Sequence, residues 1–409
     1  MSTCIECVAP ESLGLSSSRL GRIAVYLKDY VESGKLPGYL VVVARRGQPV
    51  YLDRYGWRDV EARVPVEDDT IFRIYSMTKP ITSVALMSLY ERGVFQLDTP
   101  VSAFIPAFKH LEVFESGDRD DYRSVPAERK MRISDLLTHT SGLTYGFMNL
   151  HPVDAMYRAR GVEGSRSSGT LHDMVETLGE LPLLFSPGTR WSYSVATDVL
   201  GYLVEVLSGM SLDAYLAEHI FAPLGMTDTG FFVPEDKVSR FGANYEYDAG
   251  GLRLADSPPD SPYCRKPSFL SGGGGLVSSA ADYLRFMRML RNKGELNGER
   301  ILGRKTVEFM TINHLPGNTD LAGIGQKVFS EMPFDGIGFG LGFSVVLDPA
   351  KSGIVGSPGE YAWGGAASTA FWIDPVEDMS VLFLTQLMPS SSYPIRRDLR
   401  VLSYQALVD

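Results

Sequence analysis

The sequence predicts a mixed α/β (α+β) fold in which one antiparallel sheet, built from both chain termini, is flanked by helices and carries a mostly helical insertion. Strand patterns cluster near both ends of the 409-residue chain, and between them helical periodicity alternates with polar loops. We therefore expect an α/β domain made of residues 1–100 and 265–409, into which residues 101–264 are inserted as a helical domain.

The N-terminal elements follow from the spacing of their apolar residues. Residues 18–33 place apolar side chains on one helical face. Residues 39–44 and 50–56 are apolar and aromatic runs with Gly47 in the turn between them, which is the pattern of a β-hairpin. A short extended segment then leads into a helix that we expect to begin at Ser76, with Pro80 in its first turn.

The rest of the chain shows the same contrast between its middle and its end. In the insertion we expect no strand, polar loops at 114–130 and 158–170, and helices at about 133–139, 172–179, 196–208 and 211–221. Ser279 is the predicted N-cap of a helix to about residue 292, with Asp282 reaching back in a capping box. The remaining predicted elements are strands at 340–346, 369–373 and 379–384 and a helix from about 394.

Composition argues against several kinds of partner. A net charge of −10 disfavours nucleic acid and anionic membrane surfaces, and no apolar run reaches the roughly 20 residues of a membrane span. The N-terminus lacks a basic region followed by an apolar stretch, so we expect no secretory signal and a cytoplasmic location. Cys4, Cys7 and Cys264 are too few for a disulfide framework, and the lone Cys4-x-x-Cys7 pair indicates neither a metal nor a redox site.

Ser76 and Lys79 are the first indication of chemistry. Three residues apart at a helix start, they share one helix face, where the hydroxyl and the ammonium can meet. The free backbone N–H groups of a helix start also favour nearby negative charge, so the pair suits a nucleophilic serine. A pattern this short arises by chance about once in such a chain, and an ordinary amphipathic helix start is the alternative.

Two later segments offer the remaining parts of a nucleophilic site. Tyr193 lies between a turn and an apolar helix, where a phenol beside a lysine ammonium can act as a proton shuttle. Gly364 and Gly365 let the backbone approach a ligand closely, and the N–H of Ala366 could form an oxyanion hole with that of Ser76. A structural loop tyrosine and a glycine bulge in an edge strand are the alternative interpretations.

The order of these motifs resembles a known superfamily. Ser76-x-x-Lys79, Tyr193-Ser194 and Trp363-Gly364-Gly365 are similar to the motifs of class C serine β-lactamases and penicillin-binding D,D-peptidases, and most similar to those of family VIII carboxylesterases. The resemblance spans about residues 15–405, with supporting segments at 133–143, 221–226 and 275–282. It implies a β-lactamase-like fold in which Ser76, Lys79 and Tyr193 are catalytic.

Two departures from that pattern bear on the substrate. β-Lactamases and D,D-peptidases usually carry Asn where this chain has Val195, and Lys or His where it has Trp363. The resemblance therefore implies a serine carboxylesterase that hydrolyses small to medium uncharged esters through an acyl-enzyme on Ser76. We expect Trp363, Tyr145 and Phe147, with Gly364 and Gly365, to bind the substrate. Acyl transfer to an alcohol, β-lactam hydrolysis and a non-catalytic scaffold of the same fold stay open as alternatives.

Other chemistries find little support in the sequence. The Gly-x-Ser-x-Gly elbow of α/β-hydrolases is absent, and His139 lies in an apolar segment that favours a structural role. No histidine pair has metal-ligand spacing, and the glycine-rich segment 336–342 misses the dinucleotide pattern and alternates like a strand. We expect no metal and no cofactor, and a small-molecule ester as the partner; the oligomeric state is left open.

Overall fold

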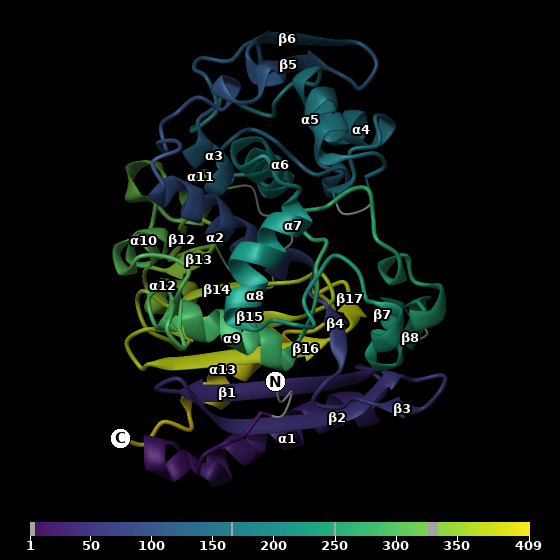
Figure 1. The fold of residues 1–409 in the computed structure, drawn as a ribbon, viewed down its shortest axis with the longest axis vertical. Coiled ribbons are helices and arrows are strands. Elements are labelled where there is room, and N and C mark those ends of the chain that lie inside the picture. The colour runs from purple at the N-terminus through teal and green to yellow at the C-terminus, as the bar shows by residue number, and fades with distance from the viewer. Residues whose placement is uncertain (1–4, 165–166, 249–250, 326–333) are drawn as a thin grey trace.

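The computed structural model of the protein describes residues 5–164, 167–248, 251–325 and 334–409. Its centre is an eight-stranded sheet of order β12-β13-β14-β15-β16-β1-β2-β3, in which every neighbouring pair is antiparallel (Figure 1). Because β1 pairs with β16, the sheet joins both ends of the chain, as predicted. Its strands are β1 (Gly38–Arg45), β2 (Gln48–Asp59), β3 (Val64–Pro65), β12 (Ile337–Phe339), β13 (Ser344–Val346), β14 (Tyr361–Gly364), β15 (Ala370–Asp374) and β16 (Met379–Thr385).

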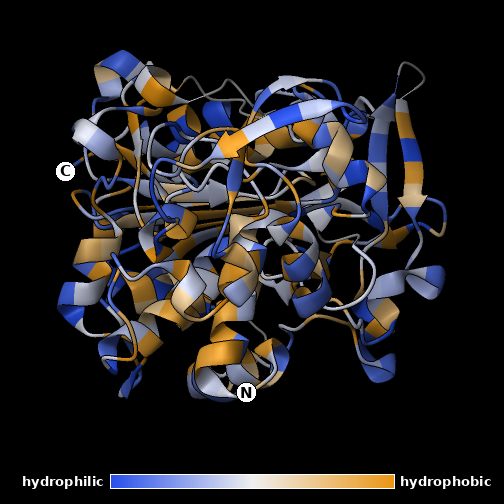
Figure 2. Ribbon diagram, turned by 90° about the horizontal axis from the view of Figure 1, so that it is seen from above, coloured by the Kyte–Doolittle hydropathy of each residue, from blue (hydrophilic) through white to orange (hydrophobic). Residues whose placement is uncertain are grey.

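Helices bury both faces of this sheet. One face carries α1 (Ser17–Glu32) and α13 (Ile395–Tyr404), and the other carries α2 (Thr78–Glu91) and α9 (Ala280–Arg291). In β1, Val41 packs with α1 and α13, whereas Leu40 and Val42 pack with α2 and α9. Alternate side chains of a strand point to opposite faces, so a strand buried on both sides is a continuous apolar run. Figure 2 shows these hydrophobic strands crossing the centre of the molecule.

The middle of the chain supplies most of the remaining helices, which lie above the sheet in Figure 1. Residues 217–221 between α7 and α8 form a π-helical turn. No single helix of the described residues has the length and apolar composition needed to cross a membrane, and Ala196–Ser208 with Leu212–Leu224 meet that criterion only as a pair bent by 81°. The helices are α3 (Ile133–Leu137), α4 (Pro152–Ala159), α5 (Leu171–Gly179), α6 (Ala196–Ser208), α7 (Leu212–Leu216), α8 (Ala222–Leu224), α10 (Arg304–Met310), α11 (Leu321–Ile324) and α12 (Pro349–Ser352).

The expectation that residues 101–264 contain no strand is wrong. They form two hairpins, β5 (Glu112–Gly117) with β6 (Tyr122–Pro126), and β7 (Asn244–Asp248) with β8 (Gly251–Asp256). The first hairpin is largely exposed on both faces, so it lacks the apolar alternation by which a strand is recognised. Its turn is set by Asp118, whose carboxylate accepts hydrogen bonds from the backbone N–H groups of Asp120 and Asp121. The division of the chain into two domains stays a prediction.

The predicted strand at 340–346 is also wrong in its bounds. The segment is a hairpin in which β12 ends at Phe339 and β13 begins at Ser344, and the turn between them includes Gly342 at φ +98°. That backbone conformation favours glycine. Smaller paired strands complete the fold: β4 (Ile71–Arg73) with β9 (Val277–Ser279), β10 (Glu295–Leu296) with β11 (Glu299–Arg300), and β17 (Leu387–Met388) parallel to β7.

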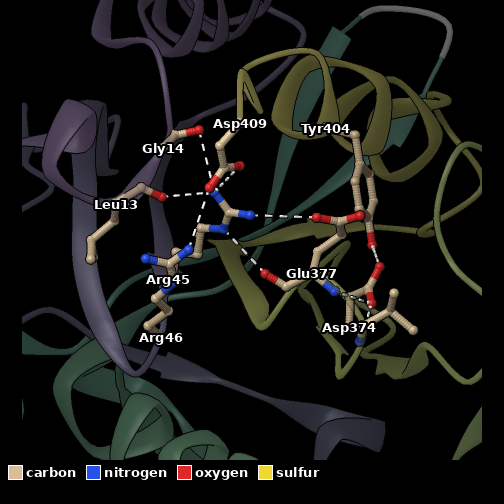
Figure 3. Close-up of polar contacts among 9 residues, drawn as sticks. Leu13, Gly14, Arg45, Arg46, Asp374, Glu377, Tyr404 and Asp409 are labelled. Carbon is tan, nitrogen blue, oxygen red and sulfur yellow. Dashed lines mark hydrogen bonds and ion pairs between the residues drawn. The ribbon is translucent and has the colours of Figure 1, made fainter.

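Arg45, at the end of β1, ties the segments near both ends of the chain to the sheet (Figure 3). Its guanidinium donates to the carbonyl oxygen of Leu13 at 2.7 Å and to the carboxylate of Asp409 at 2.7 Å. It also donates to the backbone oxygen of Glu377 at 3.1 Å. Arg45 itself is only 5% exposed, and these charge-assisted bonds hold the segment before α1 and the segment after α13 at the end of β1.

Candidate active site

Ser76 lies in a short 3₁₀ turn, Tyr75–Met77, between β4 and α2. The helix itself begins at Thr78, two residues later than predicted. The turn opens with a strained backbone, since Tyr75 has φ +42°, a conformation that non-glycine residues seldom adopt. Gln386 fixes the approach to this turn because its side-chain amide pairs with both the N–H and the C=O of Arg73, each at 3.0 Å.

Lys79 and Tyr193 both reach the hydroxyl of Ser76. The Lys79 ammonium donates to Ser76 Oγ at 3.1 Å, and the Tyr193 phenol donates to the same oxygen at 2.6 Å. Lys79 is only 2% exposed and also donates to the carbonyl oxygen of Gly273 at 2.6 Å. The three side chains named from the sequence thus meet at one atom, and the hydroxyl is within direct proton-transfer distance of a phenol.

Aromatic packing holds Tyr193 in the loop before α6. Its ring lies nearly parallel to that of Trp191, at 17° and 6.4 Å, and its centroid is 5.6 Å from that of Trp363. The Lys79 nitrogen sits 4.6 Å from the centroid of the Tyr193 ring, a cation–π contact. The phenol is therefore positioned by rigid neighbours on several sides, with its oxygen directed at Ser76.

The end of β14 lies against the turn that carries Ser76. A Cβ atom at Gly365 would be 2.5 Å from the carbonyl oxygen of Ile74, so glycine is needed for this approach. At Gly364, a Cβ would meet the guanidinium of Arg396, which donates to the Gly365 carbonyl at 2.6 Å. The N–H of Ala366 has no hydrogen-bond acceptor among the described residues. An unengaged N–H in this position is available to a ligand.

The two aromatic residues expected to line the pocket have different surroundings. Tyr145 is buried, and the centroid of its ring lies 5.2 Å from the centroid of the Tyr193 ring. The same centroid lies 5.4 Å from the Lys79 nitrogen. Burial, followed by the nearby Tyr193 and Asp198, raises the pKa of the Tyr145 phenol well above its usual value, so it stays neutral. Phe147 stacks on Tyr145 at 4.7 Å and is 45% exposed, so it lies one layer further out.

His139 is buried within the aromatic group. Its ring contacts those of Trp191 and Phe339, and its Nδ1 lies 3.2 Å from the hydroxyl of Ser194 rather than at Ser76. Burial, with a smaller contribution from the Lys79 charge, lowers its pKa well below the usual value, so the imidazole is neutral. These contacts are those of a packed core side chain.

Sequence reasoning missed Asp198, Ser271 and Gly273, which lie behind Lys79. Asp198 is fully buried and accepts hydrogen bonds from the Ser271 hydroxyl at 2.5 Å and the Gly273 N–H at 3.0 Å. The signal that could have found them is the run of four glycines at 272–275, since a Cβ at Gly273 would lie 2.6 Å from Asp198 Oδ2. Within the described part of the chain, no group of three or more His, Cys, Asp or Glu side chains could hold a metal ion.

Comparison with known proteins agrees with this geometry. The family model described as Beta-lactamase matches residues 23–406, nearly the whole chain. The chain belongs to the beta-lactamase family. Protein Rv1367c of Mycobacterium tuberculosis is 38% identical over 371 residues, which cover 90% of each chain. Esterase EstB of Burkholderia gladioli is 30% identical over 398 residues, covering 92% of this chain and 93% of EstB.

A solved structure that is similar to this beta-lactamase family member supports the same assignment. EstCE1, described as a hydrolase with promiscuous acyltransferase activity, aligns with a TM-score of 0.79 at 26% identity, over 97% of this chain and 99% of its own. The predicted resemblance to the β-lactamase superfamily is confirmed by the family model, and one of the proteins similar to this chain is an esterase. In this chain Val195 is fully buried and directly precedes α6, so the position that carries Asn in the β-lactamase pattern offers no amide here.

Proposed function

We propose that the protein is a serine esterase that hydrolyses small to medium uncharged carboxylic esters. The observation that carries the proposal is the convergence of Lys79 and Tyr193 on the hydroxyl of Ser76, at 3.1 and 2.6 Å. A non-catalytic scaffold would have no need of a buried ammonium and a phenol on one serine oxygen. The similarity to Esterase EstB and to the hydrolase EstCE1 supports the same activity.

In the proposed mechanism, Ser76 Oγ attacks the ester carbonyl carbon while its proton passes to the Lys79–Tyr193 pair. The backbone N–H groups of Ser76 and Ala366 stabilise the oxyanion of the tetrahedral intermediate. The C–O bond to the alcohol then breaks, and Tyr193 returns the proton to the departing alkoxide. Water then attacks the acyl carbonyl carbon as one of its protons passes to the Lys79–Tyr193 pair. The ester bond to Ser76 Oγ breaks, that proton returns to Ser76 Oγ, and the carboxylic acid leaves.

The substrate class follows from what surrounds this group. Trp363 and Tyr145 offer aromatic surface beside Tyr193, and Val195 offers no polar group. A substrate carboxylate would meet no cation in the place of Trp363, and an amide would meet no side-chain amide in the place of Val195. An uncharged ester needs neither contact. Slow or absent hydrolysis of nitrocefin is therefore expected.

Acyl transfer to an alcohol is the second candidate, and the description of EstCE1 as a hydrolase with promiscuous acyltransferase activity favours it. Both reactions share the acyl-enzyme and differ only in whether water or an alcohol attacks it. Product analysis with p-nitrophenyl butyrate, with and without added alcohol, separates them. A new ester that forms at the expense of free butyrate supports transfer.

The test of the nucleophile is Ser76→Ala. We expect kcat for p-nitrophenyl butyrate to fall by several orders of magnitude with the fold retained, because nucleophile loss acts on the transition state. Ser83→Ala is the matched control: Ser83 is buried on α2, and its hydroxyl has no hydrogen-bond partner among the described residues. A phosphonate adduct found by mass spectrometry on Ser76, in wild type but not in Ser76→Ala, completes the test. Near-normal turnover by Ser76→Ala overturns the proposal.

A further inference from the structure

A second buried charge lies next to Lys79. Asp198, in the first turn of α6, is fully buried. Its Oδ1 accepts from the Ser271 hydroxyl and from the Gly273 N–H, and its Oδ2 has no hydrogen-bond partner among the described residues. A buried carboxylate with one oxygen that accepts no hydrogen bond lowers the stability of the fold, so its presence needs a physical explanation.

Gly273 links this carboxylate to the serine. Its N–H donates to Asp198 at 3.0 Å, its C=O accepts from Lys79 at 2.6 Å, and Lys79 in turn donates to Ser76 at 3.1 Å. A displacement of Gly273 would therefore move the acceptor that sets the direction of the Lys79 ammonium. Asp198 holds Gly273 from the other side, and no side chain is possible there, because a Cβ would lie 2.6 Å from Asp198 Oδ2.

The ionisable groups that face Lys79 come from four places in the chain. Tyr193 and Tyr145 present ring faces to its nitrogen, at 4.6 and 5.4 Å. His139 is neutral, since burial and then the Lys79 charge lower its pKa. Asp198 contributes a carboxylate, whose pKa burial raises while the Ser271 hydrogen bond and the Lys79 charge lower it. Within this set, the charge that stabilises the ammonium is that of Asp198.

We propose that Asp198 is a positioning residue of the proposed esterase: its carboxylate fixes Gly273, and the Gly273 carbonyl in turn directs Lys79 at Ser76 Oγ. The inference rests on the proposed function of Ser76. It explains why two charges are buried together, since the N-terminal turn of α6 and the ammonium each favour the anion. It also assigns a role to the glycine run that follows Ser271.

Asp198→Asn tests the inference, because it keeps an oxygen acceptor for Ser271 and Gly273 and removes only the charge. We expect kcat for p-nitrophenyl butyrate to fall about 10- to 100-fold, the range of a misdirected catalytic group, with KM little changed. The pKa of Asp198 is raised by burial, so the ionisation of this carboxyl should contribute the acid limb of the kcat/KM profile against pH. That limb should be lost in Asp198→Asn, which has no ionisable group at this position.

Ser271→Ala should shift this acid limb rather than remove it, and it serves as the test if Asp198→Asn does not fold. Losing the Ser271 donor favours the protonated form of Asp198, so the acid limb should move to higher pH. Asp282→Asn is the control: it removes another buried carboxylate, one that accepts from the Asp228 N–H and the Thr229 hydroxyl instead. Its activity per folded molecule should match that of the wild type.

An acid limb that stays in place in the folded Asp198→Asn variant, with unchanged kcat, overturns the inference. A loss of activity per folded molecule that leaves the acid limb in place and equals that of Asp282→Asn assigns Asp198 to stability alone and also overturns it. If only Ser271→Ala folds, an acid limb of its kcat/KM profile at the wild-type pH also overturns the inference. An active Ser76→Ala would instead reject the proposed function, so the two failures are distinguishable.

Discussion

The phenol oxygen of Tyr193 lies 2.6 Å from Ser76 Oγ, although 117 positions separate the two residues along the chain. The contact joins the turn before α2 to the loop before α6. Rings around Tyr193 hold it in place, so little reorganisation is needed when a substrate arrives. The proton of the serine and the group proposed to accept it are thus prearranged before binding.

Tyr193→Phe should lower kcat far more than it changes KM. The substitution keeps the ring and its packing and removes only the hydroxyl, which is proposed to move a proton in both halves of the reaction. General acid–base groups are worth about 10²- to 10⁴-fold, and we expect a loss of that size with p-nitrophenyl butyrate. Tyr26→Phe is the control, because that phenol donates to Asp398 on the far face of the sheet. Equal kcat in wild type and Tyr193→Phe would contradict the role.

Trp363→Ala should discriminate between substrates by chain length. The Trp363 ring packs 5.6 Å from Tyr193 and 5.3 Å from Phe339, and its proposed role is to contact the apolar part of the ester. At about 25 cal/mol per Å² of apolar surface, losing part of the indole should raise KM about tenfold for a p-nitrophenyl octanoate and far less for the acetate. Trp57→Ala, at a 39% exposed tryptophan on β2, should leave both values unchanged. Equal effects on both esters would refute the contact.

Gly365→Ala tests the proposed oxyanion hole without touching an ionisable group. Its Cβ would lie 2.3 Å from Thr369 Oγ1 and 2.5 Å from the Ile74 oxygen, so the turn that carries the Ala366 N–H must shift. Loss of one oxyanion donor typically costs about 10²- to 10³-fold in kcat, and we expect a fall of that order. Gly21→Ala in α1 meets nothing within 4 Å and should instead stabilise the fold by about 0.5–1 kcal/mol. Stopped-flow acylation and urea unfolding measure the two effects.

Local pattern was sufficient to predict four strands of the sheet, β1, β2, β15 and β16, and the order of the reactive residues. Residues 39–44 and 379–384 alternate between two buried faces, and each lies within one strand of the structure. The motif of Ser76 and Lys79 is set by spacing within one turn of chain, so its geometry follows from the local backbone. The role of these residues stays a prediction, which the experiments above address.

The features that could not be predicted from the sequence are those that depend on contacts between distant segments or that lack a local pattern. Asp198 acquires its meaning only because the loop at 271–273 folds against α6, and nothing local to Asp198 indicates that loop. The exposed hairpin at 112–126 lacks the apolar alternation that marks a strand. Cys4 lies outside the described residues. Among the described residues, Cys264 forms no disulfide bond.

Asp282 shows how tertiary contacts redirect a residue that local rules assign. Ser279 caps α9 as predicted, accepting the Asp282 N–H at 3.4 Å. The predicted return bond of the capping box is replaced, because the Asp282 carboxylate accepts from the Asp228 N–H at 2.6 Å and the Thr229 hydroxyl at 2.9 Å. Burial, opposed in part by these hydrogen bonds, raises the pKa of Asp282 from 3.8 to about 6.

This shift predicts a pH-dependent loss of stability that Asp282→Asn should remove. A carboxyl with a raised folded-state pKa binds its proton more tightly when folded, so its contribution is complete below about pH 4 and is lost as pH rises towards 6. A shift of about two units corresponds to about 3 kcal/mol. Urea unfolding at pH 4, 5, 6 and 7 should show the free energy of unfolding of the wild type falling relative to that of the variant by about this amount. Parallel curves for the two proteins across this range would show that Asp282 is ionised without cost in the folded state.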